Sequence, residues 1–202
     1  VRIEIDKTVE GSKEEDGEVL AYGENIMIGY HNLPDKTKES ITGERGLRTG
    51  DLGHLDADGY LYITGRVKEQ YKLENGKYVA PAPLEESLKL SAYVDQIILY
   101  GFNRPHNVAV IVAAMPAVEK FAEENKMSGS GPSLLNEPEI KKLFQEQLEH
   151  YGKYFKSFER PQNFALLSEE WSIDNGLLTP TLKLKREVVE EQFKSQIESL
   201  YS

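Results

Sequence analysis

The stretch from Leu47 to Pro81 constrains the fold most, because it contains two hairpin turns in close succession. The first turn is Asp56-Ala57-Asp58-Gly59, and the second is Glu74-Asn75-Gly76-Lys77. Each lies between short segments rich in aromatic and aliphatic residues, a pattern typical of β-hairpins. The stretch therefore predicts local antiparallel pairing, with glycine supplying the backbone freedom that each turn needs.

Two charged residues stand on opposite sides of the first turn. Asp51 follows Gly50, and Arg66 follows Gly65, so the hairpin is expected to bring their ends together. A carboxylate can accept hydrogen bonds from hydroxyls, and a guanidinium is a fixed fork of donors that suits phosphate or ribose oxygens. Taken singly, Gly50-Asp51 is equally compatible with a plain turn and Arg66 with a surface cation.

The first turn also has part of the pattern of a calcium loop. If Asp56 and Asp58 took its third and fifth positions, Gly59 would fit the sixth. The bidentate glutamate would then have to stand where the chain has Gly65. We therefore predict a structural turn here and no metal site.

Composition excludes several classes of function. The chain has no cysteine, which rules out disulfides, zinc–thiolate sites and a cysteine nucleophile. Its 4 histidines lack metal-ligand spacing, and its net charge of −10 comes with no basic block, which argues against nucleic-acid binding. The longest apolar run, Val108 to Pro116, is too short to span a bilayer. Peripheral contact with a membrane stays open.

The remaining patterns mix strands and helices. The expected strands are Val1–Ile5, Glu18–Tyr22, Val94–Gly101, Val108–Met115 and Phe164–Leu167. The expected helices are Asp35–Ile41, Pro83–Leu90, Ala117–Lys126, Glu137–Gly152 and Arg186–Leu200, the last with Val188, Val189, Phe193 and Ile197 inward. We predict an α+β fold: a small antiparallel β-rich piece, then a lid with a short sheet flanked by helices.

A second charged motif lies near the end of the chain, in the stretch TPTLKLKR. Lys183 stands between Leu182 and Leu184, just ahead of the last predicted helix. The flanking leucines are expected to anchor the loop while the ammonium projects elsewhere. On its own, this pattern is more typical of an ordinary basic patch at a helix start.

Together these motifs resemble the adenylate-forming superfamily, which includes acyl-CoA synthetases, luciferases and peptide-synthetase adenylation domains. The fatty-acyl-CoA synthetase signature has a Gly-Asp, a hairpin, then an arginine followed closely by a lysine, as in Gly50-Asp51 and Arg66-Val67-Lys68. The preceding stretch GEVLAYGENIMIGYHNLPDKT also fits the family pattern in register. The resemblance extends over nearly the whole chain.

The resemblance implies a catalytic role for the TPTLKLKR stretch. Lys183 matches the catalytic lysine of acyl-CoA ligases, and Arg186 matches the arginine downstream of it. Many shorter-chain relatives have glycine before that lysine, where this chain has Leu182. The Leu-Thr-Pro-Thr form is similar to the long-chain fatty-acyl branch.

The resemblance implies an AMP-forming, ATP-dependent long-chain fatty-acid–CoA ligase acting in two half-reactions. Lys183 would stabilise the charge that builds during acyl-adenylate formation, and Asp51 and Arg66 would bind the nucleotide. Lys68 matches the hinge about which the lid rotates. The hairpin Glu74-Asn75-Gly76-Lys77 would then bind CoA, with Gly76 allowing close approach of the pantetheine.

The resemblance also implies an organisation in two parts. Residues 1–66 would be the end of the large ATP-binding domain, and residues 67–202 the complete C-terminal lid. The family's phosphate loop has no counterpart here, and the chain begins at Val1 within a strand pattern, so we expect a piece of a longer protein. Magnesium is expected with ATP, bound by residues outside this chain.

The implied substrates are fatty acid, ATP and CoA, with no nucleic-acid partner, in the cytoplasm. Two alternatives remain. The first is a non-catalytic binding or scaffold domain derived from such a ligase, which the joint presence of Asp51, Arg66, Gly76 and Lys183 disfavours. The second is a ligase of an aryl or other acid.

Overall fold

The chain folds into two compact units. The computed structural model describes residues 1–12 and 15–202, and the division into units falls between Gln70 and Tyr71. Each unit has its own sheet and its own buried residues. The predicted domain boundary after Arg66 lies slightly earlier in the chain than this division and stays a prediction.

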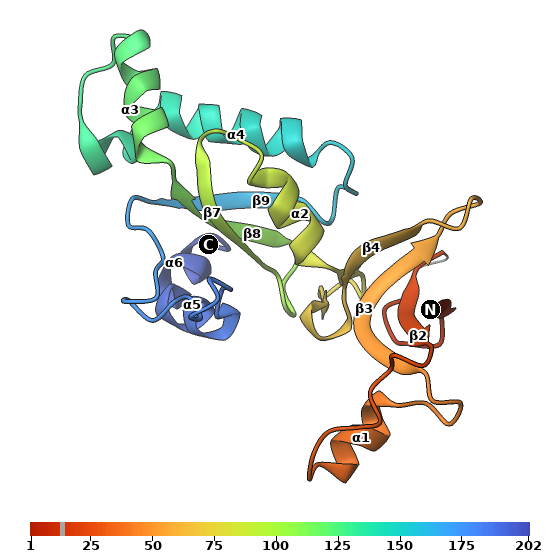
Figure 1. The fold of residues 1–202 in the computed structure, drawn as a ribbon. Helices are drawn as coiled ribbons and strands as arrows, with labels where there is room; N and C mark the ends of the chain where they lie inside the picture. Colours follow the sequence, from red (N-terminus) through yellow and green to blue (C-terminus); the bar gives the residue numbers. More distant parts are fainter. Residues whose placement is uncertain (13–14) are drawn as a thin grey trace. The chain divides into compact units, whose positions relative to one another are not determined.

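The first unit is built on an antiparallel sheet whose strands follow chain order (Figure 1). Its strands are β1 (Arg2–Asp6), β2 (Gly17–Tyr22), β3 (Leu47–Leu55) and β4 (Leu61–Arg66). The short helix α1 (Pro34–Ser40) lies between β2 and β3 in the chain, and the 3-10 helix η1 (Val67–Glu69) follows β4. β2, one of the two inner strands, is the most buried strand of this sheet.

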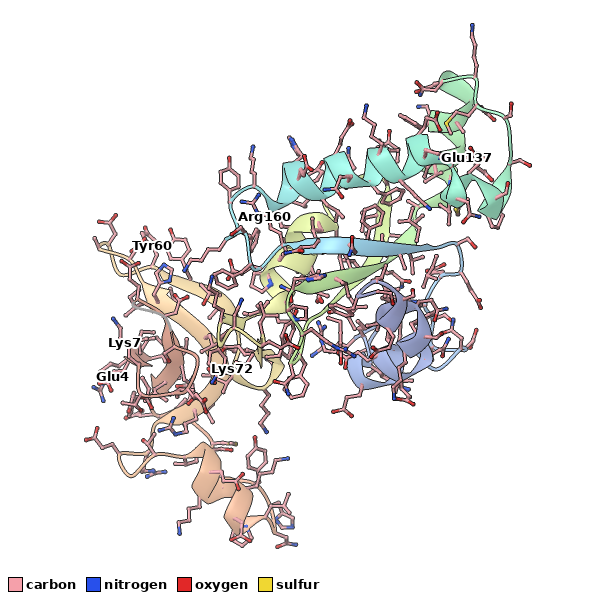
Figure 2. The ribbon with its side chains drawn as sticks, turned by 180° about the vertical axis from the view of Figure 1, so that it is seen from behind. Glu4, Lys7, Tyr60, Lys72, Glu137 and Arg160 are labelled. Carbon is pink, nitrogen blue, oxygen red and sulfur yellow. The ribbon has the colours of Figure 1, made fainter. Side chains whose placement is uncertain are left out.

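The β3–β4 turn is held by one aspartate side chain. Asp56 Oδ1 accepts the backbone N–H groups of Asp58 and Tyr60 at 3.0 and 2.8 Å, an arrangement typical of an Asx turn. Gly59 has a φ of +84°, which favours glycine. Figure 2 shows Tyr60 at the far end of this hairpin. The predicted structural turn is therefore confirmed.

The second unit contains a hairpin and a mixed sheet. The hairpin joins β5 (Tyr71–Lys72) to β6 (Tyr78–Val79). The sheet has the order β7 (Val94–Tyr100), β8 (Asn107–Ala113), β9 (Pro161–Leu167). β7 and β8 pair antiparallel, as the sequence predicts, whereas β8 and β9 pair parallel.

Helices cover both faces of this sheet (Figure 1). The helices are α2 (Pro81–Leu88), α3 (Met115–Glu124), η2 (Gly131–Asn136), α4 (Pro138–Gly152), α5 (Arg186–Gln192) and α6 (Lys194–Ser199). Helices α2, α3 and α4 each carry proline at the first or second helical position, where a missing N–H has no cost. Proline therefore marks the start of three of the helices that cover the sheet.

The sheet is buried on both sides, so alternate residues of β7 and β8 enter different cores. On one side, Ile97, Leu99 and Ile111 pack with residues of α2, α3, η2 and α4. On the other, Ile98 and Val110 pack with Trp171, Leu177 and residues of α5 and α6. β8 is buried along its whole length, which explains why its sequence is a continuous apolar run.

Most predicted elements are confirmed, but the C-terminal helix is not one helix. It is divided into α5 and α6 at Phe193, whose φ and ψ are −102° and 19°. Val189 and Ile197 are buried as expected, whereas Val188 is 45% exposed, so its predicted inward orientation is wrong. The break redirects the chain, so a single helical period does not describe both halves.

No helix within residues 1–12 and 15–202 combines the length and apolar character needed to cross a membrane. The same described residues hold no group of three or more His, Asp or Glu side chains suited to a metal ion.

The first core of the second unit predicts a clear contrast between two phenylalanines. Phe144 of α4 is fully buried, whereas Phe102 in the β7–β8 turn is 56% exposed. Phe144→Ala should lower the free energy of unfolding by about 3–5 kcal/mol, through lost burial and the cavity left behind. Phe102→Ala should change it by about 0.5 kcal/mol or less. Denaturant unfolding followed by Trp171 fluorescence measures both, and equal losses would contradict this packing.

Candidate functional site

Strand β3 carries a bulge at Thr49–Asp51. The register pairs Glu18 with Leu52 and Leu20 with Arg48, so this β3 segment lies opposite a single residue of β2. A bulge interrupts regular pairing and re-aims the side chains within it. Gly-Asp in the sequence therefore marks an irregularity in a strand, and not the end of one.

Hydrogen bonds and one glycine set the shape of the bulge. Gly50 has a φ of +75°, in the left-handed region that favours glycine. The Thr49 hydroxyl donates to the Val19 carbonyl at 2.9 Å and accepts the Asp51 N–H at 3.1 Å. The backbone of Asp51 is thus fixed by the residue two positions before it.

A charged network supports the bulge from β1 and β2. Arg48 contacts Glu18 at 2.5 Å and Asp6 at 3.0 Å, and the other oxygen of Glu18 accepts the Gly50 N–H at 3.2 Å. The hydrogen bond to Glu18 raises the pKa of Arg48. Hydrogen bonds from Thr8, assisted by Arg48, lower the pKa of Asp6. Arg48 and Asp6 therefore stay ionised at neutral pH.

Asp51 and Arg66 form an ion pair. They are directly opposed on β3 and β4, and Arg66 Nε lies 2.9 Å from Asp51 Oδ1. The side chains are 29% and 58% exposed, respectively. The hairpin therefore brings the two side chains together as the sequence predicts. A guanidinium has five N–H donors and a carboxylate two oxygens, so the pair retains capacity for a polar ligand.

Lys68 is the middle residue of η1 and is exposed. The chain is extended on both sides of this single turn, with Arg66 at φ −128° and Gln70 at φ −68°. The Gln70 N–H donates to the Arg66 carbonyl at 3.2 Å. Lys68 thus stands in a short tight segment near the end of the first unit.

The second predicted hairpin has a tight turn. The Leu73 N–H donates to the Lys77 carbonyl, and the Gly76 N–H donates to the Leu73 carbonyl, both at 2.9 Å. Asn75 Oδ1 accepts the Lys77 N–H at 3.0 Å. Gly76 has a φ of +82°, as in a type I turn closed by a G1 bulge. Residues Glu74 to Lys77 are exposed, so this tip is available to a ligand.

The base of this hairpin is joined to the β7–β8 turn. The Asn103 N–H donates to the Lys72 carbonyl at 2.9 Å, and the Glu74 N–H donates to the Arg104 carbonyl at 3.0 Å. Leu73 is 2% exposed. The hairpin therefore projects from the sheet on a fixed base.

Tyr71 adds a buried polar anchor. Its hydroxyl donates to Asn107 Oδ1 at 2.8 Å, and Asn107 Nδ2 donates to the Glu159 carbonyl at 2.7 Å. Burial raises the pKa of Tyr71 well above its usual value, so the hydroxyl keeps its proton. A side chain at Gly101 would meet Asn107 Oδ1 at 2.1 Å, which explains the glycine there.

Lys183 lies on a turn with the same hydrogen-bond pattern as the Glu74–Lys77 tip. The Thr179 N–H donates to the Lys183 carbonyl, and the Leu182 N–H donates to the Thr179 carbonyl, both at 2.8 Å. The Lys183 N–H donates to the Thr179 hydroxyl at 3.0 Å. Leu178 and Leu184 form a β-bridge below it, and the Lys183 side chain is exposed.

Leu182 occupies the position that Gly76 has in the other turn, with a φ of +60°. It is 69% exposed, so the prediction that it anchors the loop is wrong; Leu178 and Leu184 pack on the second core instead. The last residue of such a turn is left-handed and favours glycine. A glycine at this position would therefore be free of the strain that Leu182 carries.

Glu85 forms a buried ion pair that sequence reasoning missed. It lies on α2, is 6% exposed, and contacts Arg186 Nη2 through both carboxylate oxygens at 2.8 and 2.7 Å. Its only sequence signal is a carboxylate on the buried face of a helix, where an unpaired charge would be costly. A buried carboxylate predicts a cationic partner, but the local sequence does not identify which lysine or arginine it is.

The predicted site residues thus fall in two groups. Asp51, Arg66 and Lys68 belong to the first unit, and the Glu74–Lys77 tip and Lys183 belong to the second. Asp51 lies on the β3 bulge, Arg66 on β4 and Lys68 in η1. The Glu74–Lys77 tip and Lys183 lie on hydrogen-bonded turns.

Comparisons with known proteins agree with this arrangement. Residues 68–202 match the family described as "AMP-binding enzyme C-terminal domain". A long-chain-fatty-acid–CoA ligase 1 from Cavia porcellus is 36% identical over 190 residues, covering 93% of this chain and 27% of the relative. A long chain acyl-CoA synthetase 8 from Arabidopsis thaliana is 37% identical over 196 residues, covering 92% and 27%. The chain therefore spans about a quarter of the curated relatives it matches.

Solved structures support the same fold. The adenylation domain of a carboxylate reductase from Mycobacterium chelonae has a TM-score of 0.80 at 26% identity, covering 100% of this chain and 31% of that one. The corresponding domain from Segniliparus rugosus, solved with AMP and a co-purified carboxylic acid, has a TM-score of 0.79 at 24% identity, covering 100% and 31%.

The paired turns give a reciprocal stability prediction. Leu182→Gly removes a left-handed leucine, which costs about 1 kcal/mol, but adds unfolded-state entropy of similar size. The free energy of unfolding should therefore stay the same or rise by less than about 1 kcal/mol. Gly76→Ala, at φ +82° and with the new Cβ in ordinary contact with Lys72 Cε at 3.9 Å, should lower the free energy of unfolding by about 1 kcal/mol.

Denaturant unfolding of both variants beside the parent chain makes the comparison. A loss for Leu182→Gly as large as that for Gly76→Ala would show that the Leu182 side chain contributes packing that outweighs its backbone strain.

Proposed function

The chain belongs to the family of AMP-binding enzymes, whose C-terminal domain it carries, and we propose that it works as the C-terminal part of an ATP-dependent long-chain fatty-acid–CoA ligase. The observation that carries the proposal is the similarity to long-chain ligases along nearly the whole chain. Ion-pair and turn geometry at Asp51, Arg66 and Lys183 supports it. The substrates would be a fatty acid, ATP and CoA, with magnesium accompanying ATP.

In the first half-reaction, a carboxylate oxygen of the fatty acid attacks the α-phosphorus of ATP. Acyl-adenylate forms and pyrophosphate leaves, while negative charge builds on the oxygens around phosphorus. Lys183 stabilises this charge, because an ammonium held on a closed turn is preorganised for it. Asp51 accepts hydrogen bonds from the ribose hydroxyls, and Arg66 donates to ribose or phosphate oxygens.

In the second half-reaction, the sulfur of CoA attacks the acyl carbonyl and AMP leaves. The exposed tip Glu74-Asn75-Gly76-Lys77 receives CoA, and Gly76 lets the backbone approach the pantetheine closely. Lys68 is the hinge between the two orientations of the lid, because a short turn flanked by extended residues can concentrate a torsion change.

Substitution of Lys183 tests the proposed function. In the full-length protein, Lys183→Ala should lower ATP–pyrophosphate exchange with a long-chain fatty acid by about a hundredfold or more, as when one preorganised stabilising group is removed. Thioester formation from supplied acyl-adenylate should change little. Lys185→Ala, which removes the neighbouring exposed ammonium, is the matched control and should leave both steps near the parent rate.

Two results would contradict this proposal. Absence of fatty-acid-dependent exchange in the parent full-length protein would favour a non-catalytic binding domain. Equal losses in both half-reactions for Lys183→Ala would remove the lysine from the adenylation step.

The hinge role gives a separate prediction for Lys68. Proline fixes φ near −65°, a value common in 3-10 helices, and Lys68 is the second residue of η1. In the full-length protein, Lys68→Pro should therefore retain acyl-adenylate formation while CoA-thioester formation falls by about a hundredfold. Lys68→Ala is the control for loss of the ammonium alone and should retain both steps.

A thermal melt accompanies these rates, because proline disfavours helical backbone at the preceding Val67. Parallel loss of both half-reactions with a lowered Tm would mean that Lys68→Pro only loosens η1.

A further inference from the structure

The buried pair Glu85–Arg186 does more than neutralise two charges: it occupies the open edge of β7. Among the residues that the structure describes, β7 pairs only with β8, and Leu99 lies opposite Ala109. The Leu99 N–H donates to Glu85 Oε1 at 2.7 Å, and the Leu99 carbonyl accepts from Arg186 Nη1 at 3.0 Å. The two side chains thus take the hydrogen bonds that another strand would take.

Burial makes this arrangement demanding. Leu99 is fully buried and Glu85 is 6% exposed, so a lost partner would leave an unsatisfied polar group without water. Although burial favours the neutral guanidine, the Glu85 carboxylate outweighs it and raises the pKa of Arg186. Arg186 therefore stays charged, and its two contacts with the Glu85 carboxylate let each side chain constrain the position of the other.

Arg186 is an unusual residue for its place in the helix. It is the first residue of α5, where the helix dipole disfavours a cation. Its reach to Glu85 on α2 and to Leu99 on β7 compensates for that placement. The start of α5 is therefore joined to two elements far away in the sequence.

The same helix start is the base of the turn that carries Lys183. Two backbone pairings hold the residues after Lys183 to the residues before the turn. Leu184 forms a β-bridge with Leu178, and the Lys185 N–H donates to the Leu177 carbonyl at 2.9 Å. A shift at Arg186 is therefore transmitted through two backbone pairings to the lysine.

We propose that Glu85 and Arg186 are positioning residues for Lys183, holding the base of its turn against β7 so that the ammonium stands where adenylation needs it. The inference rests on the proposed function of Lys183. Neither side chain would touch the substrate. A displacement of about 1 Å at a catalytic group can cost about a hundredfold in rate, so such a clamp has kinetic consequences.

A double-mutant cycle in the full-length protein separates positioning from simple stabilisation. Arg186→Lys keeps a cation opposite Glu85 but loses the guanidinium fork that reaches Leu99. It should lower ATP–pyrophosphate exchange about tenfold, while thioester formation from supplied acyl-adenylate changes less than about twofold. In the Lys183→Ala background it should cause no further loss, because the lysine through which it acts is gone.

The experiment includes one substitute variant and one control variant. Glu85→Gln retains an acceptor for the Leu99 N–H but removes the charge, and should give the same pattern if Arg186→Lys does not fold. Arg160→Lys is the matched control, since Arg160 donates to the Phe155 and Lys153 carbonyls and is outside this network. It should leave both half-reactions at the parent rate.

The outcomes are distinct. Loss of both half-reactions in proportion to a lowered Tm, or a loss from Arg186→Lys that persists fully in the Lys183→Ala background, would overturn the positioning role. If Lys183→Ala itself leaves pyrophosphate exchange unchanged, the proposed function of that lysine fails first, and the positioning role fails with it.

Discussion

Burial of the β7–β8–β9 sheet on both faces is the constraint on which the second unit depends. Because β8 is buried along its whole length and apolar from Val108 to Ala113, helices must cover each side of the sheet. The crossover to the parallel strand β9 supplies α3 and α4 on one side. The other face is closed by Trp171, α5 and α6. The two loops that we propose for catalysis and CoA binding therefore belong to a unit whose sheet is fixed between two cores.

The two exposed loops of the second unit have the same turn structure. The Glu74–Lys77 tip and the Thr179–Lys183 turn are each closed by the same pair of backbone hydrogen bonds. Each presents an exposed polar residue on a rigid base, which lowers the entropy lost when a ligand is bound. They differ at the left-handed position, where Gly76 is unstrained and Leu182 is not. A strained, exposed leucine beside the lysine proposed for catalysis is the kind of backbone outlier that clusters at functional sites.

The sequence predicted the elements better than it predicted their partners. Hairpin turns, proline-initiated helices and the pairing of β7 with β8 follow from local residues, and so does the meeting of Asp51 with Arg66 across a short hairpin. The parallel pairing of β9, the break at Phe193 and the burial of Trp171 depend on contacts between distant segments. Glu85 shows the limit most clearly, because local pattern can identify a buried carboxylate but not its distant arginine.

The satisfied edge of β7 also makes one backbone proton informative. The Leu99 N–H is buried and held by Glu85, so it can exchange with solvent deuterium only when the carboxylate separates from it. Because Arg186 holds the same carboxylate, the protection of that one amide reports how often the foot of the lysine turn opens. Motion at the base of the Lys183 turn can thus be followed through the buried Leu99 amide of β7.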